Sequence, residues 1–228
     1  MPDTKAKLLI VDDEPSIRTS LSMVLSEIGY CVRTAGDGLE ALAQLRNDIP
    51  DILVSDLNMP GMSGFELLSV VRRRFPSVQA IAMSGAFSGD EVPSGVAAHC
   101  FYQKGSSVGS LIKMMNALPR QDRSAASHTT ESEPIWIQLS GAGNSDRSDN
   151  SDQTTVTISC PECLRSFSSP CSDVNSGEVH TAQCAHCKGL IRYSLVDPII
   201  EKAKQARESG RGRFEGSLQP SVTPPFSC

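Results

Sequence analysis

Short, continuous apolar runs alternate along the first half of the chain with stretches in which apolar residues recur every three or four positions. The runs are typical of strands buried on both faces of a parallel sheet, and the recurring pattern is typical of amphipathic helices. The strand-like segments are residues 7–11, 31–35, 51–56, 78–84 and 100–103. Helices are predicted to begin near Pro15, Gly38, Ser63 and either Ser106 or Ser107. Between the last two strands, Pro93 and Gly95 predict a fourth helix that is short or irregular.

This alternation predicts the α/β class for residues 1–120. Five strands alternating with five helices indicate a doubly wound, five-stranded parallel sheet with helices on both faces. In the flavodoxin-like strand order 2-1-3-4-5, the first and third strands are neighbours at the switch point. About 120 residues are enough for such a core.

Polar side chains that suit phosphate chemistry follow these strands. Asp12 and Asp13 end the first strand, and Asp56 ends the third. Ser84 ends the fourth strand, and Lys104 follows the fifth. Ligands of open α/β sheets bind at the carboxyl ends of the strands, and three carboxylates crowded there favour a hard dication such as Mg²⁺. In such a site Asp56 can attack a phosphoryl group in line while cations neutralise the charge on its oxygens.

These residues resemble the motif of the receiver domain of two-component response regulators. Asp12, Asp13, Ser84 and Lys104 match in order and spacing, as does Asp56 within the segment DLNMPGMSG, and the resemblance covers about residues 5–120. It implies that Asp56 is the phosphoacceptor for a sensor histidine kinase or phosphotransfer protein. The protein would then be a phosphoacceptor capable of self-dephosphorylation rather than a metabolic enzyme.

The same resemblance implies roles for individual side chains. Asp13, Asp56 and the backbone carbonyl of Asn58 would bind Mg²⁺ with help from Asp12. Ser84 and Lys104 would contact the phosphoryl group, and Phe101 would be the aromatic residue that moves together with Ser84. An aromatic residue on a buried strand is also typical of ordinary core packing, so both interpretations of Phe101 stand.

Two features depart from the family pattern. Gly105 follows the lysine where the family usually has proline. Pro93 and Gly95 interrupt the fourth helix, which is part of the face that the family usually uses for output.

Residues 121–153 are rich in Ser, Asp, Asn, Thr and Gly, which predicts a flexible linker. One island, residues 134–139, alternates like a strand and contains the only tryptophan, Trp136. The sequence leaves two roles open for it. It adds an edge strand to a second domain, or it docks on the first.

Two C-x-x-C pairs, separated by 20 residues, predict a metal site in the second half. The four residues are Cys160, Cys163, Cys184 and Cys187. Four thiolates satisfy tetrahedral Zn²⁺ in a closed, structural site. Residues 154–197 resemble a zinc ribbon of the rubredoxin-knuckle kind, a small β-rich domain in which metal binding contributes most of the folding free energy. An iron centre and a redox dithiol are the alternatives.

The remaining cysteines and nearby histidines have less specific expectations. His186 and His180 are possible substitute ligands, although His180 also suits the surface of a hairpin. Cys171 and Cys228 are expected to be free thiols. Cys31 and Cys100 are expected to be small buried hydrophobic residues.

Charge and hydropathy limit the partners and the compartment. The net charge is -5, and no apolar run approaches the roughly 20 residues that cross a bilayer. The start of the chain does not resemble a signal peptide, so a cytoplasmic location without membrane contact is expected. Residues 198–228 begin as a mixed-charge helix candidate and continue as a tail predicted to be disordered.

The sequence therefore predicts a phosphorelay response regulator whose zinc-ribbon module recognises an output protein. One alternative is a DNA-binding transcription regulator that acts through the ribbon and the modestly basic tail in residues 198–228. Nucleic-acid binding lacks other support in the sequence. Another is a scaffold that does not signal.

Overall fold

A five-stranded parallel sheet forms the first half of the chain, as predicted. The computed structural model describes residues 6–85, 96–119, 133–138, 154–171 and 177–196. The strand order is β2-β1-β3-β4-β5, so β1 and β3 are neighbours. The strands are β1 Lys7–Val11, β2 Cys31–Ala35, β3 Ile52–Asp56, β4 Gln79–Ser84 and β5 Cys100–Gln103. Because helices cover both faces of the sheet, the inner strands β3 and β4 are buried along their whole length.

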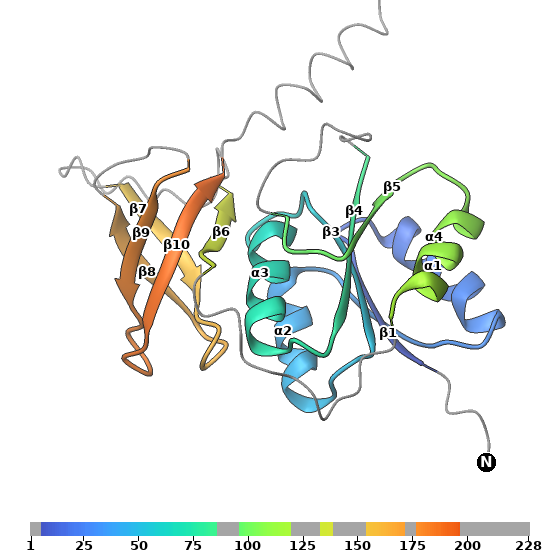
Figure 1. Ribbon diagram of the computed structural model, residues 1–228, viewed down its shortest axis with the longest axis horizontal. Coiled ribbons are helices and arrows are strands. Elements are labelled where there is room, and N and C mark those ends of the chain that lie inside the picture. Colours follow the sequence, from blue (N-terminus) through green and yellow to red (C-terminus); the bar gives the residue numbers. More distant parts are fainter. Residues whose placement is uncertain (1–5, 86–95, 120–132, 139–153, 172–176, 197–228) are drawn as a thin grey trace, which may run out of the picture. The chain divides into compact units, whose positions relative to one another are not determined.

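Four helices of this half lie within the described residues. They are α1 Pro15–Glu27, α2 Gly38–Asn47, α3 Gly64–Arg74 and α4 Val108–Ala117. In Figure 1, α1 and α4 cover one face of the sheet, and α2 and α3 cover the other. Asp37, Ser63 and Ser107 cap α2, α3 and α4, each accepting a hydrogen bond from the backbone N–H three residues further on. The helix starts predicted from these residues are therefore confirmed.

Part of the predicted pattern cannot be compared or differs. The irregular helix expected around Pro93 and Gly95 lies outside the described residues, as do the tail and its helix candidate. Cys31 was expected to be buried but is exposed, because it is the first residue of the edge strand β2. Cys100 is half-buried and packs against the core between the sheet and α1 and α4.

The second half forms two short antiparallel hairpins and one added strand. The strands are β6 Ile135–Gln138, β7 Thr154–Ser159, β8 Ser166–Cys171, β9 Val179–Gln183 and β10 Leu190–Val196. β7 pairs with β8, β9 pairs with β10, and β6 joins β10 in parallel. We call β6 to β10 the four-cysteine unit.

Strand β6 has both of the roles that the sequence left open. It is an edge strand of the second half through β10, and it also packs along α3 of the first half. The described residues, the last of which is Val196, accordingly belong to one packed unit.

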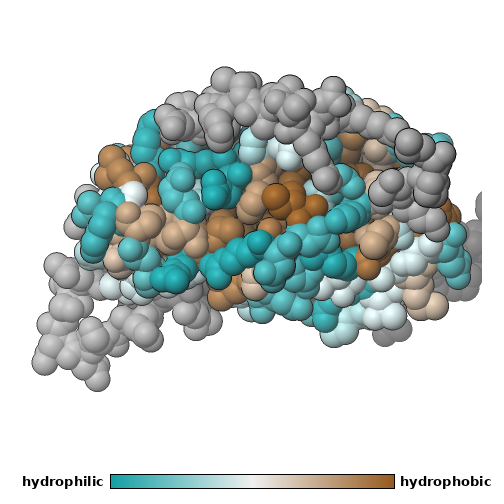
Figure 2. Space-filling model, turned by 90° about the horizontal axis from the view of Figure 1, so that it is seen from below, coloured by the Kyte–Doolittle hydropathy of each residue, from teal (hydrophilic) through white to brown (hydrophobic). Residues whose placement is uncertain are grey.

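The described surface carries few exposed large apolar residues. Met23 and Val24 lie on α1, Ile28 follows its end, and Leu39, Ile49, Val179 and Leu190 lie elsewhere. On the face seen in Figure 2, brown apolar areas lie among teal polar ones. None of the four described helices has the length and apolar character needed to cross a membrane.

Candidate functional site

Three carboxylates meet at the carboxyl edge of the sheet, as predicted. Asp12 and Asp13 follow β1, and Asp56 is the last residue of β3, so adjacent parallel strands deliver all three to one place. Their carboxylate oxygens lie within 4.8 Å of one another. Asp12 and Asp56 are buried, whereas Asp13 is exposed. The exposed member leaves this cluster open to solvent on one side.

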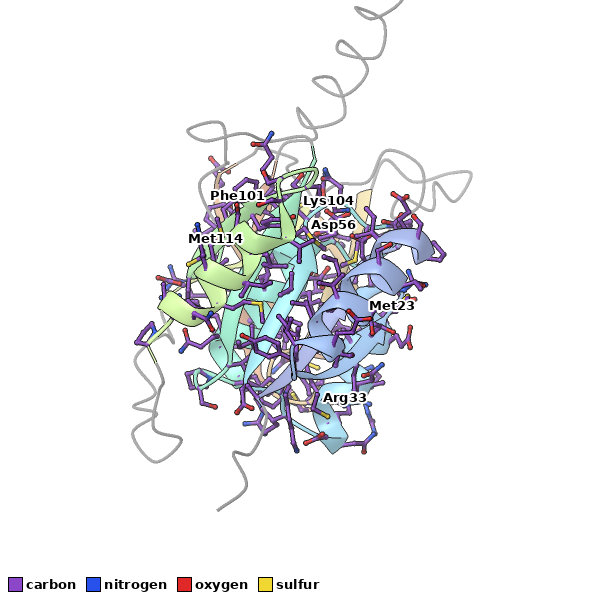
Figure 3. The ribbon with its side chains drawn as sticks, turned by 90° about the vertical axis from the view of Figure 1, so that its right-hand side faces the viewer. Met23, Arg33, Asp56, Phe101, Lys104 and Met114 are labelled. Carbon is purple, nitrogen blue, oxygen red and sulfur yellow. The ribbon has the colours of Figure 1, made fainter. Side chains whose placement is uncertain are left out.

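Lys104 joins the two buried carboxylates. Its Nζ lies 2.8 Å from Oδ2 of Asp12 and 2.8 Å from Oδ2 of Asp56. The backbone N–H of Lys104 donates to the carbonyl of Ser84, the buried last residue of β4, at 2.8 Å. Figure 3 shows Asp56 and Lys104 together at one end of the sheet. The five residues singled out from the sequence are thus brought to one edge.

Gly105 explains how the loop after Lys104 turns without a proline. Its φ is +89°, a left-handed conformation that glycine adopts without strain and that proline, with φ near −65°, cannot adopt. No cis peptide bond occurs within the described residues. This loop therefore follows a different backbone path from one that a proline at position 105 would require.

Burial controls the electrostatics of the cluster. Burial raises the pKa of Asp56 to about 6, while the Lys104 ammonium opposes this rise and the negative charge of Asp12 adds to it. For Lys104, burial acts to lower the pKa, but the carboxylates of Asp56 and Asp12 outweigh it and raise the pKa above its ordinary value. At neutral pH Asp56 is thus mostly ionised, and Lys104 is protonated.

The oxygen atoms present fit a hard dication. Oδ1 of Asn58, two residues after Asp56, is buried and has no hydrogen-bond partner among the described residues. Carboxylate and carbonyl oxygens are ligands that Mg²⁺ accepts, usually with waters and phosphate oxygens completing the octahedron. The donor set around Asp56 is therefore suited to Mg²⁺.

Comparisons with known proteins agree with this geometry. The family model for the response regulator receiver domain matches residues 8–113, a segment that contains Asp12, Asp56, Ser84 and Lys104. These residues form a response regulator receiver domain. Receiver domains of two-component response regulators are its homologues.

Individual relatives match this receiver domain and little else. The probable transcriptional regulatory protein TcrX of Mycobacterium tuberculosis is 31% identical over 116 residues, which are 50% of this chain and 50% of TcrX. The response regulator MprA of Mycobacterium ulcerans is 33% identical over 119 residues, 51% of each chain. The solved chemotaxis protein CheY4 of Vibrio cholerae is 34% identical, with a TM-score of 0.47, and the match covers 50% of this chain and 98% of that one. The chain spans no more than about half the length of these curated relatives.

Next to the receiver's acidic site lies a cavity of about 220 Å³ that sequence reasoning did not anticipate. Lys104, Gly105 and Tyr102 line one side, and Ser16 and Ile17 of α1 line the other. Tyr102 is buried, and its hydroxyl donates to the carbonyl of Ser106 at 2.7 Å. The alternation of β5 places the neighbouring Phe101 on the opposite face of the sheet, where it is half-buried.

The second half brings its four cysteines together. The Sγ atoms of the four cysteines all lie within 4.8 Å of one another. The closest pairs run between the two C-x-x-C pairs: Sγ of Cys160 is 3.6 Å from Sγ of Cys187, and Sγ of Cys163 is 3.7 Å from Sγ of Cys184. A tetrahedral Zn²⁺ with bonds of about 2.3 Å to sulfur requires sulfur atoms about 3.8 Å apart. The four thiols are therefore spaced as such a site needs.

Each C-x-x-C pair forms the turn of one hairpin, and the two turns have the same hydrogen bonds. The N–H of Leu164 donates to the carbonyl of Cys160, and the N–H of Lys188 donates to that of Cys184. Leu164 and Lys188 also share a left-handed backbone, with φ of 55° and 64°. Such equal turns present two sulfurs each to one point, so we call them the first knuckle (residues 160–165) and the second knuckle (184–189).

The histidines do not belong to this cluster. Nε2 of His186 donates to the carbonyl of Ser166 at 3.1 Å, and His180 packs its ring against Tyr193 with ring centroids 5.3 Å apart. Cys171 is buried and is not disulfide-bonded. Neither histidine is placed as a substitute ligand.

The thiols differ in their tendency to ionise. Burial opposes ionisation of Cys184, but backbone N–H groups of Cys187 and His186 lower its pKa to about 6. Burial raises the pKa of Cys160 and of Cys163. A cation at the centre would supply the positive charge needed to keep all four sulfurs deprotonated.

Proposed function

We propose that the protein is a phosphorelay response regulator that is phosphorylated on Asp56 by a histidine kinase or phosphotransfer protein. The observation that supports this most directly is the convergence of Asp12, Asp13, Asp56 and Lys104, with Lys104 Nζ 2.8 Å from Asp56. Two buried carboxylates and an ammonium gathered at a solvent-accessible edge of the sheet are typical of a functional site.

Each residue of the site has a role in the transfer. A carboxylate oxygen of Asp56 attacks the phosphorus in line, the bond from phosphorus to the donor's nitrogen breaks, and an acyl phosphate forms. Lys104 neutralises charge on the phosphoryl oxygens, and the hydroxyl of Ser84 donates a hydrogen bond to one of them. Mg²⁺, held by Asp12, Asp13, Asp56 and the backbone carbonyl of Asn58, would supply further positive charge. Phe101 would fill the space that Ser84 leaves when it moves toward the phosphate.

The four-cysteine unit completes the proposal as the output module. We assign Zn²⁺ to Cys160, Cys163, Cys184 and Cys187, in the manner of a zinc ribbon, with a structural role. A redox dithiol needs only the two sulfurs of one C-x-x-C pair, whereas here all four sulfurs converge within 4.8 Å, as a four-coordinate metal requires. The unit would recognise an output protein.

An Asp13→Asn variant tests the metal part of the phosphoacceptor site. Asp13 is exposed, so its replacement leaves the buried pair of Asp12 and Lys104 in place. We expect the Mg²⁺ concentration for half-maximal phosphorylation by a small phosphodonor to rise about tenfold, since one anionic ligand is lost. The rate at saturating Mg²⁺ should largely recover.

The matched control for this experiment is Asp48→Asn. Asp48 pairs with Lys7 at the amino edge of the sheet, away from the acidic cluster, and removing it should leave the Mg²⁺ dependence unchanged. An Asp13→Asn protein with the Mg²⁺ dependence of the wild type would show that Asp13 does not hold the metal.

A further inference from the structure

The first two turns of helix α3 are buried on all sides, which is unusual for a helix that lies on the outside of a sheet covered by helices on both faces. Every residue from Gly64 to Val71 is buried, including the polar Glu66 and Ser69. A helix covered on one side alone keeps its polar residues in water. The sheet covers one side of α3, and the four-cysteine unit covers the other through β6 and the end of β7.

Two buried polar residues of α3 hold the four-cysteine unit. The N–H of Ser159 donates to Oε1 of Glu66 at 2.6 Å, and the N–H of Trp136 donates to Oγ of Ser69 at 3.3 Å. Glu66 and Ser69 are three positions apart, so they lie on the same face of α3. Glu66 is buried, and this burial raises its pKa to about 7 although hydrogen bonds from Ser159 oppose the rise.

These contacts converge on the first knuckle. Ser159, which precedes Cys160, is bound by Glu66, and the carbonyl of Leu164, which follows Cys163, accepts a hydrogen bond from Arg46 of α2. Within the knuckle, Oε1 of Glu162 lies 3.8 Å from Nε of Arg73. The ion pair of Arg73 and Glu162 adds little free energy, because the side chain of Glu162 is about half exposed. The bond between Glu66 and Ser159 is the strong one, because both residues are buried and a buried N–H without a partner is costly.

The first residue of the same helix touches the phosphoacceptor. A Cβ atom on Gly64, the first residue of α3, would lie 1.9 Å from the backbone oxygen of Asp56. The N–H of Gly64 donates to the carbonyl of Leu57 at 3.0 Å. The backbone of Asp56 and the first turn of α3 are thus in direct contact, and Glu66 lies in that same turn.

From this arrangement we propose that metal binding by the four cysteines is linked to the phosphoacceptor site through the first turn of α3. When the two knuckles bind the metal, the N–H of Ser159 donates to Glu66, and this hydrogen bond keeps the turn packed against Asp56. Without metal this hydrogen bond breaks and α3 is exposed to solvent. Coupling between two sites is reciprocal. Phosphorylation of Asp56 therefore changes the metal affinity by the same factor by which metal binding changes the phosphorylation equilibrium of Asp56. This link rests on the metal and phosphoryl sites proposed above.

The first test uses the full chain with and without Zn²⁺. The only tryptophan, Trp136, lies in the contact with α3, so its fluorescence reports on docking, and amide hydrogen exchange reports on α3 itself. Removing the metal with a chelator should speed exchange at residues 65–71 at least tenfold and shift the tryptophan emission, while α1 is unaffected. Unchanged exchange in α3 after verified metal loss would overturn the link.

Two substitutions of Glu66 distinguish loss of its hydrogen bond with Ser159 from general damage to the fold. Glu66→Ala leaves the N–H of Ser159 without its acceptor beside Cys160, and the Zn²⁺ affinity, measured by competition with a chromophoric chelator, should fall about tenfold. Glu66→Gln keeps an oxygen acceptor and should bind Zn²⁺ as the wild type does. Equal affinities in all three proteins would contradict the link.

The same samples distinguish failure of this link from failure of the proposed function. Metal content and phosphoryl uptake are measured by mass spectrometry in each protein. A chain that takes up zinc and phosphoryl groups while α3 does not respond overturns only the link. A chain that takes up no phosphoryl group but whose α3 still responds to metal overturns the phosphoacceptor assignment, and with it the effect of phosphorylation on metal affinity. A chain that binds no zinc overturns both the zinc assignment and the link.

Discussion

Removing the metal from the four-cysteine unit is expected to unfold its two hairpins and to leave the sheet of the receiver domain folded. The unit has a small core of its own, formed by Val156, Ile158, Ile191, Tyr193 and a few neighbours. Binding of structural Zn²⁺ contributes on the order of 10 kcal/mol to the folding of such small domains. Chelation should therefore remove the amide protection of β7 to β10, with protection of β1, β3 and β4 retained.

Single cysteine variants check that this unfolding follows from the site itself. Cys184→Ser removes a sulfur whose pKa is lowered and should abolish stoichiometric zinc binding, whereas Cys31→Ser, on the exposed edge of the receiver, should not change it. Protected hairpins in a protein shown to be metal-free would contradict the assignment of a structural metal.

Replacing Asp56 with asparagine is expected to stabilise the receiver domain in the absence of Mg²⁺. The pKa of Asp56 rises from 3.8 to about 6 on folding, so the folded state binds more protons than the unfolded state between these values. Stability is therefore lost as the pH rises from about 4 to about 6. Asparagine does not titrate, so the variant should be more stable than the wild type above pH 6 by up to about 3 kcal/mol, and no more stable below pH 4.

Helical ellipticity during urea unfolding measures this effect, because every described helix lies in the receiver domain. Mg²⁺ should stabilise the wild type and not the variant, since only the wild type has the complete ligand set. Asp37→Asn is the control: asparagine also caps helices well, so its stability should stay within about 0.5 kcal/mol of the wild type. An Asp56→Asn protein that is less stable than the wild type at pH 7 would show that the carboxylate is not under electrostatic strain.

The acidic site could be predicted because its residues follow from local patterns. An apolar run of strand length ends in Asp12 or in Asp56, and the strand order that places these ends together is strongly constrained for alternating strands and helices. The cysteine pairs were equally informative, because two residues between cysteines allow a tight turn that presents both sulfurs to one point. These predictions required few assumptions about which distant segments of the chain pack together.

The contact between α3 and the four-cysteine unit could not be predicted in the same way. In sequence, Glu66 and Ser69 are the polar positions between Phe65, Leu68 and Val71, which is the pattern of a helix with one solvated face. Their burial depends on strands that lie more than 60 residues further along the chain. Only the alternation around Trp136 signalled that a strand in the polar stretch needed a partner, and it did not identify α3.

The conformation of Gly105 also had no local signal. A glycine after Lys104 is compatible with many backbone paths, and its φ of +89° could be read only from the folded loop. The departure from the family pattern was therefore visible in the sequence, whereas its consequence was not.

The central claim is that Asp56 accepts a phosphoryl group in the site formed with Lys104, and the intact mass of the protein tests it most directly. The full chain is incubated with a small phosphodonor and Mg²⁺, beside Asp56→Asn and the distant control Asp48→Asn. One added phosphoryl group in the wild type and in Asp48→Asn, and none in Asp56→Asn, is the predicted result. An adduct of equal amount in the Asp56→Asn protein, or no adduct in a folded, Mg²⁺-bound wild type, would contradict the account.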